Sequence, residues 1–158
     1  MTLPRTGEVP SFSAAFSITT RGHAIFLNER LRPLRLSAGQ FPVLMLLAQE
    51  QNITQETLVR HYRLDKGTIA RAVRKLEAAG YIRRIVDPGN RRAVRIFLTE
   101  SGEAVVPVLK AINSQWEDSV CAGLDGEERG TLEALIRRVA ANSLAIMESS
   151  DRYSGDDE

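Results

Sequence analysis

Cysteine and histidine are scarce in this chain of 158 residues, which contains one cysteine, Cys121, and two histidines, His23 and His61. A single cysteine forms no internal disulfide and no cysteine-based metal site. The two histidines lie too far apart in the sequence to form a local metal motif. We therefore expect no metal and no cofactor, and a fold that depends on its apolar core alone.

Long apolar runs are absent as well. The longest uninterrupted one, Pro42 to Ala48, is far shorter than the ~20 residues that a membrane-spanning helix needs. The first residues, MTLPRTGEVPSF, contain one arginine and no apolar segment of the kind found in secretory signals. The apolar fraction of 43% and the charged fraction of 26% are typical of a globular domain. We expect a cytoplasmic protein with no membrane partner.

Charge is distributed unevenly along the chain, although the net charge is only +1. Residues 54–98 contain 11 Lys and Arg against 4 Asp and Glu, whereas residues 99–158 contain 5 against 13. A basic central segment beside an acidic end indicates a nucleic-acid-binding surface on an otherwise non-basic scaffold. The alternative is a solvated surface whose charge is merely uneven.

Two helices are predicted before the basic segment. Between Ser11 and Leu31, apolar residues recur at helical spacing, which predicts one long helix that ends before the next proline. Ser37 and Gln40 form a capping-box pattern for a second helix that runs to about residue 50. Pro42 falls just past the first turn of this helix and is expected to remove one backbone hydrogen bond.

The basic segment has the pattern of a helix-turn-helix. Thr54 is the expected N-cap of a short helix, and Asp65 is the expected N-cap of a helix over Lys66–Ala79, with Gly80 as its C-terminal cap. The apolar stripe of this second helix is formed by Ile69, Ala72, Val73 and Leu76. Its outward positions are Lys66, Gly67, Ala70, Arg71, Arg74 and Lys75. An amphipathic helix with a basic outer face, following a short helix and a tight connector, is typical of DNA recognition.

A β-hairpin follows this helix. Two β-prone runs, residues 81–86 and 93–98, flank the sequence Asp87-Pro88-Gly89-Asn90, in which proline and glycine fit a type II turn. Arg91 and Arg92 lie beside the tip. The hairpin is therefore predicted to be a basic wing.

Two further helices complete the chain. Thr99 caps the first, which is expected to reach Leu124 and to hold Cys121 as a small buried apolar residue. Its predicted stripe is Val105, Val108, Leu109, Ile112, Trp116 and Val120. Asp125 and Glu128 form a second capping box. The last helix has the stripe Leu132, Leu135, Ile136, Val139, Ser143 and Met147.

This order of elements resembles the MarR family of winged-helix transcription regulators. Three segments carry the resemblance: residues 36–41 (LSAGQF), residues 65–84, which span the helix with the basic face and the first wing strand, and residues 87–92 followed by 98–102. Two departures stand out. Asn90 replaces a wing aspartate that often braces an arginine, and Gly67 and Ala70 replace a serine and a threonine.

The resemblance implies a mainly α fold with a small β-wing, in which a winged helix-turn-helix core is flanked by long N- and C-terminal dimerisation helices. Its expected parts are a flexible lead (1–10), an N-terminal dimerisation helix (11–36), the DNA-binding region (37–98), the C-terminal dimerisation helices (99–148) and a flexible acidic tail (149–158). Together they form one compact domain.

The function implied is that of a homodimeric, sequence-specific regulator, expected to be a repressor, on a near-palindromic site in double-stranded DNA. Its recognition helix enters the major groove through Lys66, Thr68, Arg71, Arg74 and Lys75. For Arg74 and Lys75 the alternative is contact with phosphate alone. In the minor groove, Arg92 is the first candidate of the wing and Arg91 the second. No catalytic residue is expected.

Many members of the family release DNA when a small phenolic or anionic ligand binds between the dimerisation helices and the DNA-binding lobe. Arg21, His23 and Phe41 are the residues predicted to border such a crevice, and the alternative for His23 is a packed, hydrogen-bonded histidine. Two other functions stay open. One is a low-specificity, DNA-organising protein with the same basic surface, and the other is a thiol enzyme built on Cys121, which has no histidine near it in the sequence.

Overall fold

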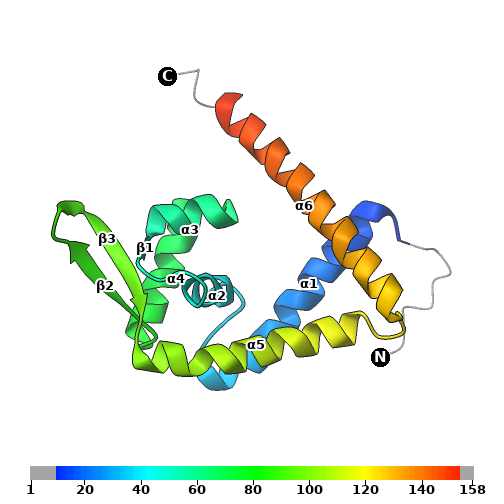
Figure 1. Ribbon diagram of the computed structural model, residues 1–158, viewed down its shortest axis with the longest axis horizontal. Coiled ribbons are helices and arrows are strands. Elements are labelled where there is room, and N and C mark those ends of the chain that lie inside the picture. The colour runs from blue at the N-terminus through cyan, green and yellow to red at the C-terminus, as the bar shows by residue number, and fades with distance from the viewer. Residues whose placement is uncertain (1–9, 154–158) are drawn as a thin grey trace.

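The computed structural model describes residues 10–153 and, within them, the side chains of all but Arg92 and residues 150–153. In chain order the elements are α1 (Phe12–Leu31), the 3-10 turn η1 (Arg32–Leu34), α2 (Phe41–Leu47), β1 (Ile53–Thr54), α3 (Gln55–Tyr62), α4 (Lys66–Ala78), β2 (Ile82–Asp87), β3 (Asn90–Leu98), α5 (Glu100–Val120) and α6 (Gly126–Tyr153). The predicted fold class, mainly helical with a small β-wing, is confirmed. Figure 1 shows α2, α3, α4 and the sheet grouped into a winged lobe, from which α5 leads away towards α1 and α6. We call α1, α5 and α6 together the helical arm.

The second helix is shorter than predicted. Residues 38–40 form a turn, in which the side-chain oxygen of Gln40 accepts the Ser37 N–H at 2.8 Å, and α2 begins only after it. Pro42 therefore lies in the first turn of α2. No intrahelical N–H bond exists at that position, so the expected loss of a hydrogen bond was wrong.

The helix-turn-helix is confirmed in its caps and in its packing. The side chains of Thr54 and Asp65 each accept a backbone N–H from the first turn of α3 and α4. Between the two helices Arg63 has a positive φ of 50°, and Gly80 ends α4 with a φ of 81°. All four residues of the predicted apolar stripe are buried: Ile69, Ala72, Val73 and Leu76.

The sheet has three antiparallel strands in the order β1-β3-β2. The β2–β3 hairpin was predicted, whereas β1 was not, because two residues are too few to show an alternating pattern. Ile53 of β1 pairs with Ile96 of β3, and both side chains are buried. The sheet thus covers one side of the core and carries the wing at its far end.

The turn between β2 and β3 differs from the predicted type II turn. That turn needs a positive φ at its third residue, and Gly89 is not among the described glycines with positive φ. Instead, Asp87 Oδ1 accepts the Gly89 N–H at 2.9 Å, so the side chain itself closes the turn. The pairing then jumps from Val86–Val94 to Asp87–Asn90, which leaves residues 91–93 in a bulge on β3.

The first turn of α5 lies directly against the end of α4. The Thr99 hydroxyl accepts the Gly102 N–H at 3.1 Å and donates to the Gly80 carbonyl at 2.6 Å. The backbone N–H of Thr99 donates to the Tyr81 carbonyl at 3.0 Å. A Cβ on Gly102 would lie 2.1 Å from that carbonyl oxygen, so glycine alone permits the approach.

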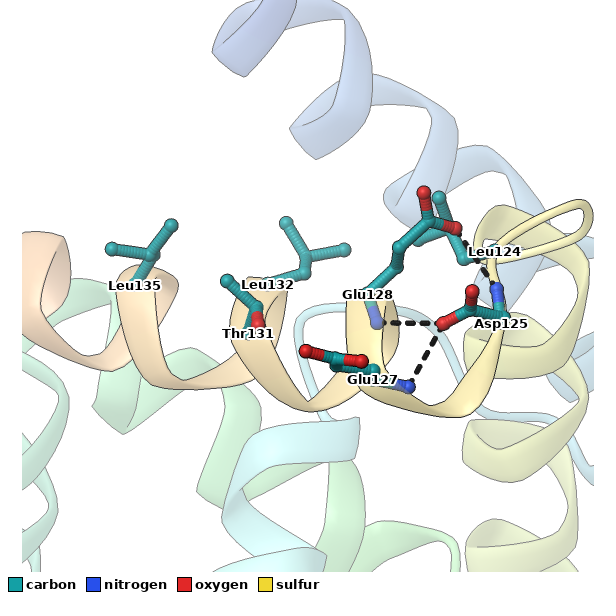
Figure 2. Close-up of a pocket in the computed structure, with 7 residues that line it drawn as sticks. All are labelled: Leu124, Asp125, Glu127, Glu128, Thr131, Leu132 and Leu135. Atoms are coloured by element: carbon teal, nitrogen blue, oxygen red, sulfur yellow. Dashed lines mark hydrogen bonds between the residues drawn. The ribbon is translucent and has the colours of Figure 1, made fainter.

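The link between α5 and α6 was partly mispredicted. α5 ends at Val120, so Cys121 follows the helix and is half-buried. The capping box of α6 is confirmed: Asp125 Oδ1 accepts the N–H groups of Glu127 and Glu128 at 2.9 Å, and Glu128 accepts the Asp125 N–H at 3.0 Å (Figure 2).

The C-terminal helix is longer than expected. It continues to Tyr153, so residues 149–153 are helical and not part of a loose tail. Serine and aspartate are weak helix formers rather than helix breakers, so a helix already begun continues through them. The predicted flexible segments at residues 1–9 and 154–158 lie outside the described residues.

The core occupies the winged lobe and the adjoining ends of α1 and α5. Leu31, Leu44, Leu58, Leu76 and Leu109 are all fully buried in it. The apolar stripes of the helical arm are not: Phe12 is 70% exposed, Val108 44% and Ile136 49%. Val108 belongs to the predicted stripe of α5 but is not buried within the single chain.

Candidate nucleic-acid interface

The outer face of α4 is basic and accessible. Lys66, Arg71, Arg74 and Lys75 are exposed, and Thr68 is half-buried. Within the described residues, the side chains of Lys66, Arg74 and Lys75 make no hydrogen bond or ion pair. The structure thus brings the predicted residues of the recognition helix onto one surface, where their charges are available to a polyanion.

One of these residues, Thr68, has its hydroxyl already engaged. It donates to Asp65 Oδ2 at 2.5 Å and accepts from Arg71 Nη2 at 2.9 Å. Asp65 also accepts the Thr68 N–H at 2.8 Å. The hydrogen bonds from Thr68, followed by the attraction of Arg71, hold the pKa of the Asp65 carboxyl below its usual range. Arg71 and the N-cap of α4 are therefore joined through Thr68.

The wing is held together by Asp87. Its carboxylate accepts the Gly89 N–H at 2.9 Å and the Arg95 Nε–H at 3.0 Å. These two bonds, of which the one from Gly89 has the larger effect, lower the pKa of Asp87. Arg91 is exposed in the bulge beside the turn. The backbone of Arg92 belongs to the same bulge, but its side chain lies outside the description.

Some arginines of the basic segment are paired with a carboxylate. Arg84 of β2 donates through Nε to Glu77 of α4 at 2.9 Å, which raises the pKa of Arg84 and lowers that of Glu77. Arg95 is paired with Asp87, and Arg63 with Glu148 of α6. Charge counting along the sequence did not separate these paired arginines from the others, because their partners lie on different elements.

An apolar hollow of about 490 Å³ lies between α1, α5 and α6. His23 borders it and stacks on Trp116, with 5.0 Å between the ring centroids. The Nε2 of His23 is buried without a hydrogen-bond partner in the described part of the chain, and burial lowers its pKa. The alternative prediction for His23 was a packed, hydrogen-bonded histidine. His23 is packed, but its Nε2 makes no hydrogen bond within the described residues.

The two other residues predicted to border a ligand crevice lie elsewhere. Arg21 is exposed on α1 and borders none of the hollows described here, and Phe41 is buried in the core. A separate hollow of about 630 Å³ does lie between α6 and the turn from α3 to α4, bordered by Arg63 and Met147 among others. The structure therefore does not bring Arg21, His23 and Phe41 together.

Leucine side chains extend the apolar surface of the helical arm along α6. Leu132 and Leu135 point to the same side of α6, one turn after the capping box of Asp125 (Figure 2). With Leu124 they border a shallow hollow of about 410 Å³. Leu132 and Leu135 also border the hollow beside His23, so the two hollows share these apolar side chains, which we call the apolar face of α6.

Other kinds of site receive no support from residues 10–153. Their His, Cys, Asp and Glu side chains include no group able to hold a metal ion. None of their helices has the length and hydropathy of a bilayer-spanning segment. Cys121 is half-buried at the end of α5, where its N–H bonds to the Glu117 carbonyl.

Comparison with known proteins gives one consistent result. The model of the MarR family matches residues 36–94. The chain is 33% identical over 115 residues to the HTH-type transcriptional regulator YybA of Bacillus subtilis (strain 168), covering 73% of this chain and 77% of that protein. It is 30% identical over 114 residues to the multiple antibiotic resistance protein MarR of Escherichia coli (strain K12), covering 72% and 79%. A solved MarR transcriptional regulator from Methanosarcina mazei Go1 has a TM-score of 0.81 and 36% identity, covering 85% of this chain and 96% of that one.

Proposed function

The chain belongs to the MarR family of DNA-binding transcriptional regulators, and from this premise we propose that it is a homodimeric, sequence-specific repressor. It is a regulator rather than an enzyme. The observation that carries the proposal is the basic outer face of α4, which lies on the same lobe as the arginine-bearing wing. Such a surface, on a chain whose residues 99–158 are acidic, is suited to a polyanion.

In the proposed complex α4 lies in the major groove and the wing reaches the minor groove. Arg71 is the first base-edge candidate, since a guanidinium matches two acceptors of guanine. Arg74 is the second, with contact to a phosphate as its alternative. Lys66 and Lys75 neutralise phosphates. Arg92, and Arg91 after it, enter the minor groove, where a narrow A·T-rich segment has the strongest negative potential.

The helical arm is proposed to form the dimer. Residues 11–36 and 99–148 are the proposed dimerisation region, and residues 37–98 the DNA-binding region. Support comes from the large apolar side chains that α1 and α6 expose, among them Phe12, Leu135 and Ile136, because grouped exposed apolar side chains mark interaction surfaces. A two-fold dimer places two copies of α4 on one face of DNA, so the site is a near-palindrome with half-sites about one helical turn apart.

The proposal includes release of DNA by a small phenolic or anionic ligand. Of the three residues predicted to border the ligand crevice, only His23 borders the apolar hollow. The hollow that His23 borders is lined mainly by apolar side chains, with Thr19, Thr20 and His23 as its few polar residues, a composition typical of small-molecule sites. A phenolic acid such as 4-hydroxybenzoate serves as a probe. It should raise the melting temperature of the wild type and not that of a His23→Phe variant.

Selection of bound DNA from a random duplex pool, combined with sedimentation of the free protein, tests the function. Enrichment of a near-palindrome by a protein of twice the chain mass supports the proposal. Tight, salt-dependent binding without any enriched sequence indicates the low-specificity DNA-organising protein instead. For the repressor role, transcription from a promoter that contains the selected site should fall when the protein is added.

A further inference from the structure

The side chain of Arg71 is held at the N-terminal end of α4 rather than extending at random from the helix. Its Nη2 donates to the Thr68 hydroxyl at 2.9 Å, and that hydroxyl donates to Asp65 Oδ2 at 2.5 Å. Asp65 is itself fixed as the N-cap by the Thr68 N–H at 2.8 Å. The three side chains form a continuous chain of hydrogen bonds from the helix cap to the guanidinium.

Gly67 makes room for this arrangement. A Cβ at this position would lie 3.1 Å from Asp65 Oδ1 and 3.3 Å from Arg71 Nη1. Both distances are tighter than ordinary contacts, so a side chain here would press on the carboxylate and on the guanidinium together. The φ of Gly67 is not positive, so the backbone itself does not require glycine. Room for Arg71 is therefore what this glycine provides.

Holding the guanidinium has a direct consequence for recognition. An arginine on a flexible side chain loses rotamer freedom when it binds, and this loss opposes binding. Arg71 has already lost part of that freedom in the protein alone. Within the described residues its side chain makes one hydrogen bond, that to Thr68, so its other N–H groups are left for a planar, two-acceptor partner.

We propose that Asp65, Thr68 and Gly67 form a frame that fixes Arg71 as the specificity-determining residue of α4, reading one guanine in each half-site. The inference rests on the proposed function, and it adds which residues position Arg71 for that contact. Guanine follows from geometry, because its O6 and N7 edge is the base edge that accepts two parallel N–H bonds from a guanidinium. Thr68 then acts through Arg71 and makes no base contact of its own.

A Gly67→Ala substitution separates this role from a structural one. Alanine is the better helix former, so the melting temperature should stay the same or rise. The added methyl group nevertheless displaces Arg71, and the preference for guanine at one position of each half-site should fall at least about fivefold. Gly130→Ala on α6, where a Cβ meets nothing within 4 Å, is the matched control and should leave the preference unchanged.

Asp65→Asn and Arg71→Lys complete the set. Asparagine caps a helix as well as aspartate does, so Asp65→Asn retains stability. It removes the negative charge and replaces one of the two oxygens that accept from Thr68 with an NH2 donor, so the frame is weakened. The substitution should reduce the same guanine preference. Lysine keeps the positive charge of Arg71 but makes no bidentate contact, so Arg71→Lys should lose the preference while the dependence of affinity on salt is retained.

The readout is the base preference at each position, obtained by selection from a random pool for the wild type and each variant. A wild-type site with one guanine per half-site that weakens in Gly67→Ala, Asp65→Asn and Arg71→Lys supports the frame. A clear palindromic site whose guanines respond to none of the three overturns the frame and leaves the proposed function intact. A wild type that selects no site at all overturns both.

Discussion

The imidazole of His23 stacks on the indole of Trp116, with ring centroids 5.0 Å apart and ring planes 30° from parallel. The contact joins α1 to α5 at the edge of the apolar hollow. It also takes Nε2 of His23 out of water with no hydrogen-bond partner among the described residues, and burial lowers the pKa of the imidazole. The folded chain therefore favours the neutral form of His23.

A dependence of stability on pH follows from this contact. Because the pKa of His23 is lowered on folding, its contribution to stability is present above its ordinary pKa of about 6.5 and is lost as the pH falls through the lowered value. Between pH of about 7.5 and about 5.5, the melting temperature of the wild type should fall more than that of His23→Phe, which keeps the ring contact and binds no proton. Thermal unfolding at the two pH values checks this, and an equal fall in both proteins would contradict it.

Two neighbouring residues of α5 should respond differently to truncation. Leu109 is fully buried, so Leu109→Ala should lower the free energy of unfolding by ~2–5 kcal/mol. Val108 is exposed, and Val108→Ala should change it by no more than ~0.5 kcal/mol. Urea unfolding of both variants measures the difference. Similar losses in the two would mean that Val108 is covered by another chain.

Two helical glycines give opposite predictions. Gly102→Ala places a methyl group against the Tyr81 carbonyl, so α5 has to shift, and we expect a loss of about 3 kcal/mol. Gly130→Ala on α6 meets no atom within 4 Å and should stabilise the chain by ~0.5–1 kcal/mol. Melting temperatures of the two variants provide the test. A harmless Gly102→Ala would show that the junction of α4 and α5 is looser than described.

Paired and unpaired arginines should differ in their effect on DNA binding. Arg74 has no partner among the described residues, so Arg74→Gln should reduce the slope of log affinity against log salt by about 1, one phosphate contact. Arg84 is bound to Glu77, and Arg84→Gln should change the slope much less. Affinities at a series of salt concentrations measure both slopes. Equal changes would mean that DNA displaces Glu77 from Arg84.

The proposed dimer predicts a contrast on α6. Leu135 borders both hollows of the apolar face, so a Leu135→Glu variant would bury a charge in the interface and should sediment as a monomer. Arg137 has a side chain that is 83% exposed, and Arg137→Glu should remain a dimer. If Leu135→Glu sediments as the wild type does, the interface lies elsewhere.

Local signals were sufficient for the winged lobe. Thr54, Asp65 and Thr99 were recognised as caps from residue type and position, and each accepts the expected backbone N–H. The basic face of α4 also follows from the sequence, since helical spacing places Arg71 and Arg74 opposite the buried stripe. Each of these features depends on residues close together in the chain, so each can be predicted from the sequence.

Features that depend on contacts between distant segments could not be predicted from the sequence. β1 exists only because Ile53 meets Ile96, and Arg84 finds its partner on another element. The apolar stripe of α6 was recognised, but whether it packs within one chain or against a second copy is not a local property. The same holds for Gly67, whose role becomes visible only once the position of the Arg71 guanidinium is known.

The close contact at Gly102 also determines how motion travels through the molecule. Two hydrogen bonds of Thr99 and the contact with the Tyr81 carbonyl lock the start of α5 to the end of α4 and the base of the wing. α5 has 21 residues and is about 30 Å long, its first turn is fixed to the winged lobe, and Pro107 lies inside it. A swing of the whole helix by about 10° about its winged end moves its far end by about 5 Å. In a two-fold dimer, the angle between the two copies of α5 therefore sets the span between the two recognition helices.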